Sequence, residues 1–330
     1  MNIKLVLLIT ITFFSLTSKT SPVISAEYEQ ERTSDQFQRN STSVSFDTCR
    51  RDLFWPYVGE CSQTLGWGLQ FKKNEVSIPE IPTLGSARPG VLGSGLKLVG
   101  SVGTRLSPNH HLDIEIGGHS LNADPLYPTM VAAVGMAQVN WKVTPSWDLS
   151  FSEGRDLVYN ELKLPAAFSH ALTAWTFQTQ SLYRLGHTWR FPIRGNLRNY
   201  SDENSSWEYD LAVLYGVSPG TPWIWVGLGF NQLSYQIQKS DYWTPKKVTS
   251  DGPRLEWDIP LYRKLSFSGG ANFNHIAEQN APEAEGYVAL AGLKYGLREG
   301  FNMKIQYSKI ETTQLGKAWS SDSVSFTINN

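Results

Sequence analysis

From about Leu65 to its end, the chain returns repeatedly to short segments in which apolar and polar side chains alternate. In the clearest one, residues 301–308, Phe, Met, Ile and Tyr stand at the odd positions and Asn, Lys, Gln and Ser at the even ones. Successive side chains of a β-strand point to opposite faces, so such a segment has one apolar and one polar face. Further segments of this kind are residues 95–106, 111–117, 137–143, 147–151, 175–180, 189–194, 207–213, 254–259 and 265–274.

The connections between these segments differ in length at their two ends. Short turn sequences include Ser107-Pro108-Asn109, Thr144-Pro145 and Tyr262-Arg263-Lys264, whereas residues 239–252 and 277–285 are longer polar stretches. Hairpins that are short at one end and long at the other are typical of membrane barrels. The pattern predicts an all-β fold, a transmembrane antiparallel up-and-down β-barrel of about 14–16 strands, the higher number applying if weakly patterned stretches such as 157–164 hide further strands.

The N-terminus has the features of a secretory signal peptide. Lys4 supplies positive charge, residues 5–16 are almost entirely apolar, and Ser25-Ala26 forms a small-residue cleavage site. The alternative is an uncleaved anchor helix, but the apolar core is shorter than the roughly twenty residues a spanning helix needs. We therefore expect a signal peptide over residues 1–26 and export to the outer membrane of a Gram-negative-type bacterium.

The segment that follows the expected signal lacks a regular pattern. Residues 27–62 are rich in Glu, Gln, Arg, Ser and Thr and show no sustained alternation. Such composition favours a flexible N-terminal arm. The barrel is then expected to occupy residues 63–330.

A large soluble β-protein, such as a sandwich or propeller, is the main alternative to the membrane barrel. The aromatic residues, 12 Trp, 14 Tyr and 15 Phe, recur near strand ends, as they do in the girdles of membrane barrels. The polar faces also carry many charges, which a packed soluble core would exclude. A net charge of −1, from 29 basic and 30 acidic residues, argues against a nucleic-acid partner.

The chain has two cysteines, Cys49 and Cys61. An exported chain passes through an oxidising compartment, so we expect them to form a disulfide, with two unpaired thiols as the alternative. Two cysteines without further nearby His or Cys ligands cannot complete a tetrahedral metal shell.

The charged residues of the alternating segments share the polar face and are candidates to line a lumen. Their mixed signs suit a neutral or zwitterionic sugar chain, or simply solvated passage, better than strong ion selectivity. Most large aromatic residues share the opposite face, where they would anchor the barrel in the membrane interface. The pore-lining candidates are Lys97, Arg105, His111, Asp113, Glu115, Lys142, Arg190, Arg194, Glu208, Asp210, Arg254, Glu256, Asp258 and Lys304.

The densest group of ligand-like residues lies between His110 and His119 and includes His111, Asp113 and Glu115. Strand neighbours two apart are roughly 7 Å from each other, too far for all of them to bind one ion without help from other strands. An ordinary polar wall is the simpler interpretation. We expect no metal and no cofactor.

Two Ser–His pairs invite comparison with nucleophilic enzymes. Ser120 follows His119, and Ser169 precedes His170. Adjacent residues of a strand point to opposite faces, so neither pair can act as a local dyad if its segment is extended. No catalytic residue is predicted.

Two segments resemble a known family. Residues 196–217, "NLRNYSDENSSWEYDLAVLYGV", carry a Tyr-Ser-Asp-x-Asn motif, and residues 225–261 carry Tyr242-Trp243-Thr244-Pro245 before a strand. Both are similar to the C-terminal barrel of the exopolysaccharide-export porins, which serve poly-N-acetylglucosamine and cellulose secretion. The resemblance covers residues 149–330. Because the long helical repeats of those exporters are missing here, the chain looks more like the stand-alone barrels of the group.

The resemblance implies a porin-like conduit, or an accessory, in envelope exopolysaccharide export. The implied partners are outer-membrane lipid, a polysaccharide polymer and synthesis machinery in the periplasm or inner membrane. One alternative is a structural or adhesive barrel with a plugged lumen, in which residues 239–252 would form the contact surface. Another is a lipid-modifying barrel enzyme.

Overall fold

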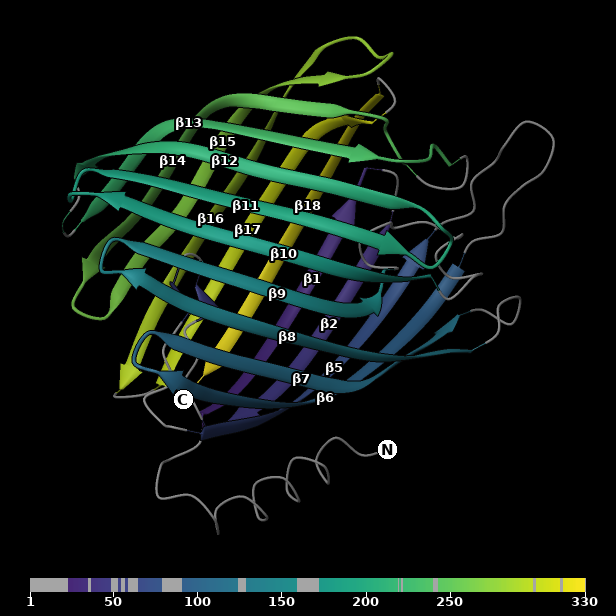
Figure 1. The fold of residues 1–330 in the computed structure, drawn as a ribbon, viewed down its shortest axis with the longest axis horizontal. Helices are drawn as coiled ribbons and strands as arrows, with labels where there is room; N and C mark the ends of the chain where they lie inside the picture. The colour runs from purple at the N-terminus through teal and green to yellow at the C-terminus, as the bar shows by residue number, and fades with distance from the viewer. Residues whose placement is uncertain are drawn as a thin grey trace.

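The fold is a closed antiparallel β-barrel of sixteen strands within the described part of the chain (Figure 1). This computed structural model describes residues 23–34, 37–48, 53–54, 57–58, 65–78, 91–123, 129–158, 172–218, 220, 222–239, 243–298, 301–314 and 317–329. Each barrel strand pairs with the barrel strands before and after it along the chain, β2 pairing with β5, and β1 closes the barrel against β18. The predicted all-β, up-and-down barrel is confirmed. Across the described ranges, no helix is long and apolar enough to cross a membrane.

The strands of the barrel run from end to end of the chain. The first half comprises β1 (Val23–Thr33), β2 (Gln38–Asp47), β5 (Leu65–Ile78), β6 (Val91–Ser107), β7 (His110–Ala123), β8 (Met130–Thr144), β9 (Trp147–Leu157) and β10 (Thr173–Leu185). The second half comprises β11 (Trp189–Tyr200), β12 (Ser205–Ser218), β13 (Trp223–Tyr235), β14 (Val248–Tyr262), β15 (Leu265–Glu278), β16 (Ala284–Arg298), β17 (Phe301–Gln314) and β18 (Lys317–Asn329). A separate small hairpin is formed by β3 (Leu53–Phe54) and β4 (Tyr57–Val58).

The alternation of the sequence becomes an outer and an inner face. Large apolar side chains such as Ile116, Val131 and Leu228 are 72%, 75% and 66% exposed. Residues on the opposite face of the same strands, such as His119 and Asp113, are buried. An exposed apolar face that runs around a closed barrel matches a lipid-facing surface, and the polar face then points inward.

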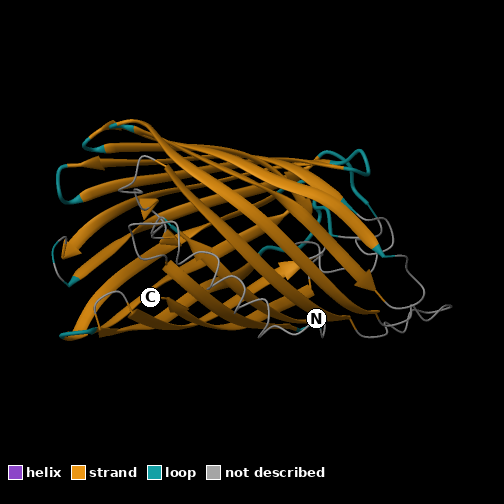
Figure 2. Cartoon of the chain, turned by 90° about the horizontal axis from the view of Figure 1, so that it is seen from below, coloured by secondary structure: helices purple, strands orange, loops and turns teal. Residues whose placement is uncertain are grey.

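The two ends of the barrel differ, and we call them the turn end and the loop end. At the turn end, β6 and β7 are joined through residues 108–109, and β8 and β9 through residues 145–146. The start of β1 and the end of β18 also lie at the turn end. They are side by side, since Ser25 pairs with Asn329. The loop end carries several longer connections, including residues 158–172 and 236–247, whereas the turn end has one long connection, residues 48–64. Figure 2 shows the barrel from the side, with its strands strongly tilted.

The barrel begins much earlier in the chain than the sequence pattern predicts. Residues 23–33 and 38–47 form β1 and β2, which pair with each other and complete the barrel between β18 and β5. The expectation of a flexible arm over residues 27–62 is therefore wrong for these two strands. Their alternation is hidden because the outward face of β2 carries apolar side chains only at Val44 and Phe46, with Gln38, Asn40 and Thr42 beyond them.

Two other expectations need smaller changes. The long polar stretch 239–252 is not all loop, because β14 already begins at Val248. The two strands that bring the total to sixteen are β1 and β2. The stretch 157–164 was expected to hide further strands, but residues 159–164 lie outside the described residues. Cys49 and Cys61 also lie outside them, so their disulfide stays a prediction.

Candidate functional site

The candidate site is the inner wall of the barrel. The register places every predicted pore-lining residue on the face opposite to the exposed apolar side chains. Lys97, for example, stands opposite His119, and Glu208 stands opposite Asn196. That these side chains line a conducting pore remains a prediction. The residues on this face are Lys97, Arg105, His111, Asp113, Glu115, Lys142, Arg190, Arg194, Glu208, Asp210, Arg254, Glu256, Asp258 and Lys304.

Four of these residues form a charge network across β11 to β14. Arg190 of β11 reaches Glu256 of β14 and donates a hydrogen bond to its carboxylate. Glu256 also accepts a hydrogen bond from Nε of Arg254 at 2.9 Å. Nη1 of Arg254 lies 3.5 Å from Oδ1 of Asp210 on β12. Two guanidinium groups and two carboxylates thus compensate each other on one patch of wall, which we call the charge network.

The charge network is shielded from solvent to different degrees. The side chains of Arg190 and Arg254 are 6% and 12% exposed, and that of Glu256 is 14% exposed. Ionised groups at such positions require partners, because their hydration has been removed. Glu256 therefore stabilises two arginines at once.

Two tryptophans lie beside the charge network, and sequence reasoning missed their orientation. Trp225 stands opposite Glu256, and Trp223 stands opposite Asp258, so both indoles face inward. The Arg190 guanidinium carbon lies 4.4 Å from the ring centroid of Trp225 and 5.0 Å from that of Trp223. The alternation could not reveal this orientation, because Ile224, Val226 and Leu228 make the other face of β13 apolar as well.

Glu208 forms a second polar centre on the same wall. Its carboxylate accepts hydrogen bonds from Nδ2 of Asn196 at 2.9 Å and from Nδ2 of Asn231 at 3.3 Å. Arg194 lies 3.7 Å away. The two asparagines were not among the predicted wall residues, although Asn196 shares its face with Arg194.

Nearer the loop end, Asp156 contacts two residues that the sequence did not connect. It forms an ion pair with Lys97, and its carboxylate lies 2.7 Å from Nδ1 of His119. His119 is only 2% exposed. Asp156 is far from both residues in sequence, so only strand order could bring them together.

The group of ligand-like residues between His110 and His119 is divided in the structure. His119 pairs with Asp156, whereas Nε2 of His111 lies 3.3 Å from Asp113. The ring of His110 stacks on that of Trp141, with centroids 5.3 Å apart. Within the described ranges, no three His, Cys, Asp or Glu side chains are grouped so that they could hold a metal ion.

The Ser–His pairs do not form dyads where the structure describes them. His119 is buried on the inner face, whereas Oγ of Ser120 lies 3.4 Å from the carbonyl oxygen of Leu96 on the other face of β7. Ser169 and His170 lie outside the described residues.

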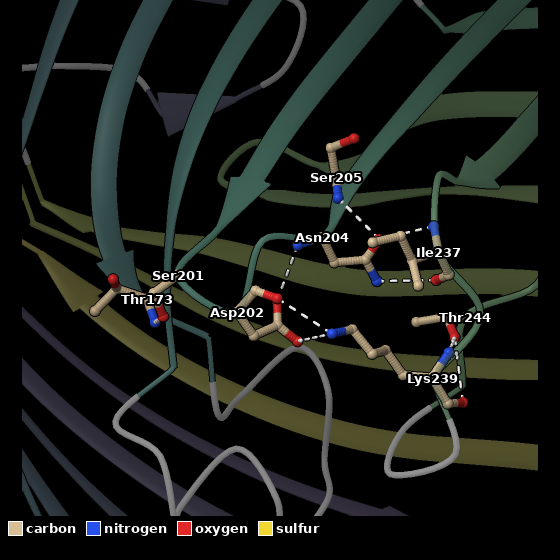
Figure 3. A network of polar contacts seen from close by, with 8 residues as sticks. All are labelled: Thr173, Ser201, Asp202, Asn204, Ser205, Ile237, Lys239 and Thr244. Atoms are coloured by element: carbon tan, nitrogen blue, oxygen red, sulfur yellow. Dashed lines mark hydrogen bonds and ion pairs between the residues drawn. The ribbon is translucent and has the colours of Figure 1, made fainter.

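A loop-end junction is formed by the hairpin that joins β11 to β12 and the segment that follows β13 (Figure 3). Asn204 is 2% exposed and bridges the two. Its Nδ2 donates to the carbonyl oxygen of Ile237 at 3.0 Å, and its Oδ1 accepts from the amides of Ile237 and Ser205 at 3.0 and 2.9 Å. One side chain therefore satisfies three backbone groups.

Further contacts extend the loop-end junction along the same segment. Lys239 lies 3.6 Å from the carboxylate of Asp202 and donates to its carbonyl oxygen at 3.1 Å. The Lys239 amide donates to Oγ1 of Thr244 at 2.6 Å, and the Tyr235 amide donates to the carbonyl oxygen of Pro245. The described parts of the two motifs that carry the family resemblance, residues 200–204 and 243–245, are thus both bonded to residues 235–239.

An apolar cluster lies beneath the loop-end junction. It consists of Val158, Leu172, Ala174, Tyr200 and Tyr235, all at most 8% exposed. The rings of Tyr200 and Tyr235 stack with centroids 6.0 Å apart, and their register points both inward. This side of the lumen is therefore packed at the loop end.

Comparisons with known proteins identify the fold. No family model matches the chain, and no curated protein matches its sequence. Among solved structures, a bacterial polysaccharide outer membrane secretin is similar with a TM-score of 0.68 and 10% identity, covering 94% of this chain and 98% of that one. The CymD monoaromatic hydrocarbon channel has a TM-score of 0.50 and 7% identity, covering 95% and 89%. The chain has the fold of outer-membrane barrels.

Proposed function

We propose that this chain is an outer-membrane conduit for an exopolysaccharide. The observation that carries the proposal is the polar inner wall, which bears both signs of charge around a closed barrel. Compensated charges suit a neutral or zwitterionic solute better than a strongly charged one. The structural likeness to the polysaccharide secretin extends over nearly the whole of both chains, and the motifs at the loop-end junction support the same family.

Export through a cleaved signal peptide is part of this proposal. Cleavage after Ala26 removes the first residues of β1, but Glu27 to Thr33 keep their partners on β18 and β2. The barrel can therefore close after processing. Mass spectrometry of the protein isolated from outer membranes measures the N-terminus directly.

Conductance in planar bilayers tests the conduit. We expect purified protein to give discrete conductance steps with weak selectivity between small cations and anions. A well-folded preparation that never conducts contradicts the proposal. In the native host, deletion of the gene is expected to lower the amount of polymer at the cell surface.

A plugged structural barrel is the second candidate, and the apolar cluster at the loop end favours it. If this cluster closes the lumen, the unaltered protein is silent in bilayers and the Tyr200→Ala, Tyr235→Ala double variant conducts. If the unaltered protein conducts and the double variant conducts equally, the cluster is no plug. The two candidates therefore give opposite results in one assay.

A further inference from the structure

We propose that Trp223 and Trp225 form a stacking subsite for a neutral sugar ring on the lumen wall near the turn end. The inference rests on the proposed function, because it names where a sugar chain would contact the wall. Indole faces are large, rigid and apolar, and the C–H face of a pyranose packs well against such a surface. Trp223 and Trp225 occupy consecutive inward positions of β13, and their ring planes are inclined at 71°, so each offers a separate surface.

Two glycines beside Trp225 leave part of its ring uncovered. Across the strand pair it faces Gly216 on β12, and the next inward position along β13 is Gly227. Neither residue has a side chain that could cover the indole. Both tryptophans are accordingly half-buried, in contrast to the fully buried Leu214 on the neighbouring strand.

Arg190 holds the two indoles in place. It lies over both rings, and its guanidinium donates a hydrogen bond to Glu256. A guanidinium over an indole is attracted to the ring face and removes rotamer freedom before any ligand binds. The remaining exposed surface of the rings is therefore preorganised.

The charges around the pair define the preferred ligand. Four carboxylates lie on this part of the wall, those of Asp148, Asp210, Glu256 and Asp258. They outnumber the three guanidinium groups there, those of Arg184, Arg190 and Arg254. Carboxylates accept hydrogen bonds from sugar hydroxyls, and the slight excess of negative charge disfavours a uronate. A neutral sugar chain fits better than an anionic one.

Isothermal titration calorimetry of the full-length protein in detergent, with cellohexaose as the probe, tests the subsite. We expect saturable binding that weakens about tenfold in Trp223→Ala and in Trp225→Ala, consistent with the loss of one stacked surface. An oligogalacturonate of the same length is expected to bind more weakly than cellohexaose. Trp207→Ala is the matched control, because Trp207 is exposed on the outer face of β12.

Trp225→Phe distinguishes loss of the stacking surface from loss of folding. It keeps an aromatic face and should bind cellohexaose within about threefold of the unaltered protein. The proposal is overturned if cellohexaose does not bind, if both alanine variants bind normally, or if Trp207→Ala weakens binding equally. Calorimetry does not require conduction. Binding without conductance refutes the conduit alone, and conductance without binding refutes the subsite alone.

Discussion

Within β11 to β14, the loop-end junction and the charge network stabilise the same four strands by different means. The loop-end junction depends mainly on neutral hydrogen bonds between Asn204 and backbone amides and carbonyls, and its one ion pair, Asp202–Lys239, is partly exposed. The charge network uses ionised groups, with Glu256 between Arg190 and Arg254. Breaking a neutral hydrogen bond lowers the free energy of unfolding modestly, whereas removing the partner of a buried charge lowers it much more. The comparison therefore predicts a ranking of variants.

Glu256→Gln is expected to have the largest effect. The substitution removes the negative charge that Arg190 and Arg254 share, and breaking a buried pair costs about 3 kcal/mol or more. Chemical unfolding of the protein in lipid vesicles, followed by tryptophan fluorescence, measures the free energy of unfolding. Asp258→Asn is the control, since Asp258 lies two residues away on the same face. If both variants lose the same amount of unfolding free energy, Glu256 is not the central residue of the charge network.

Asn204→Ala is expected to act locally and less strongly. The substitution removes the hydrogen bonds that the Asn204 side chain makes to the amide and the carbonyl of Ile237. Their loss costs about 2 kcal/mol of local stability. Hydrogen exchange of the Ile237 amide should then accelerate about 30-fold, as that energy implies. Ser205→Ala, which removes a hydroxyl bonded to the exposed Gln236, should leave this exchange unchanged. Unchanged exchange in Asn204→Ala would show that other contacts hold the loop-end junction.

Asp202→Asn is expected to have the smallest effect. Asp202 and Lys239 are 25% and 29% exposed and 3.6 Å apart, and such pairs contribute less than about 1 kcal/mol. A double-mutant cycle with Lys239→Met measures the coupling. The coupling should fall as salt is raised from 0.05 to about 0.5 M, because partly exposed charges are screened. A coupling energy above about 2 kcal/mol would contradict this expectation, because it would make the pair as strong as the buried pairs of the charge network.

The prediction of the strands succeeded where one face is apolar along most of its length and failed where it is not. β17 alternates over Phe301 to Ser308, and this half of the strand is enough to predict it. In β1, the outward side chains beyond Tyr28 are Gln30 and Arg32, so the pattern fades halfway along the strand. The pairing of β1 with β18 requires the two ends of the chain to meet, which no local pattern records.

The candidate site shows the same division. Alternation assigned Arg190, Arg254 and Glu256 to the polar face, but it could not pair them. Arg190 and Glu256 are 66 residues apart and lie on strands separated by two others. Trp223 and Trp225 were missed because both faces of their strand are apolar at that end.

The sequence by itself determined the class of fold and the side of each strand that is wet, because both follow from a period of two along the backbone. Only the tertiary structure decided that residues 23–33 and 38–47 belong to the barrel, which charges compensate each other, and that two tryptophans face inward. These depend on strand order and register, which place residues far apart in sequence within hydrogen-bonding distance. In the sequence, the motifs around Asn204 and Thr244 are two separate segments. In the fold, both bond to residues 235–239 and form the loop-end junction.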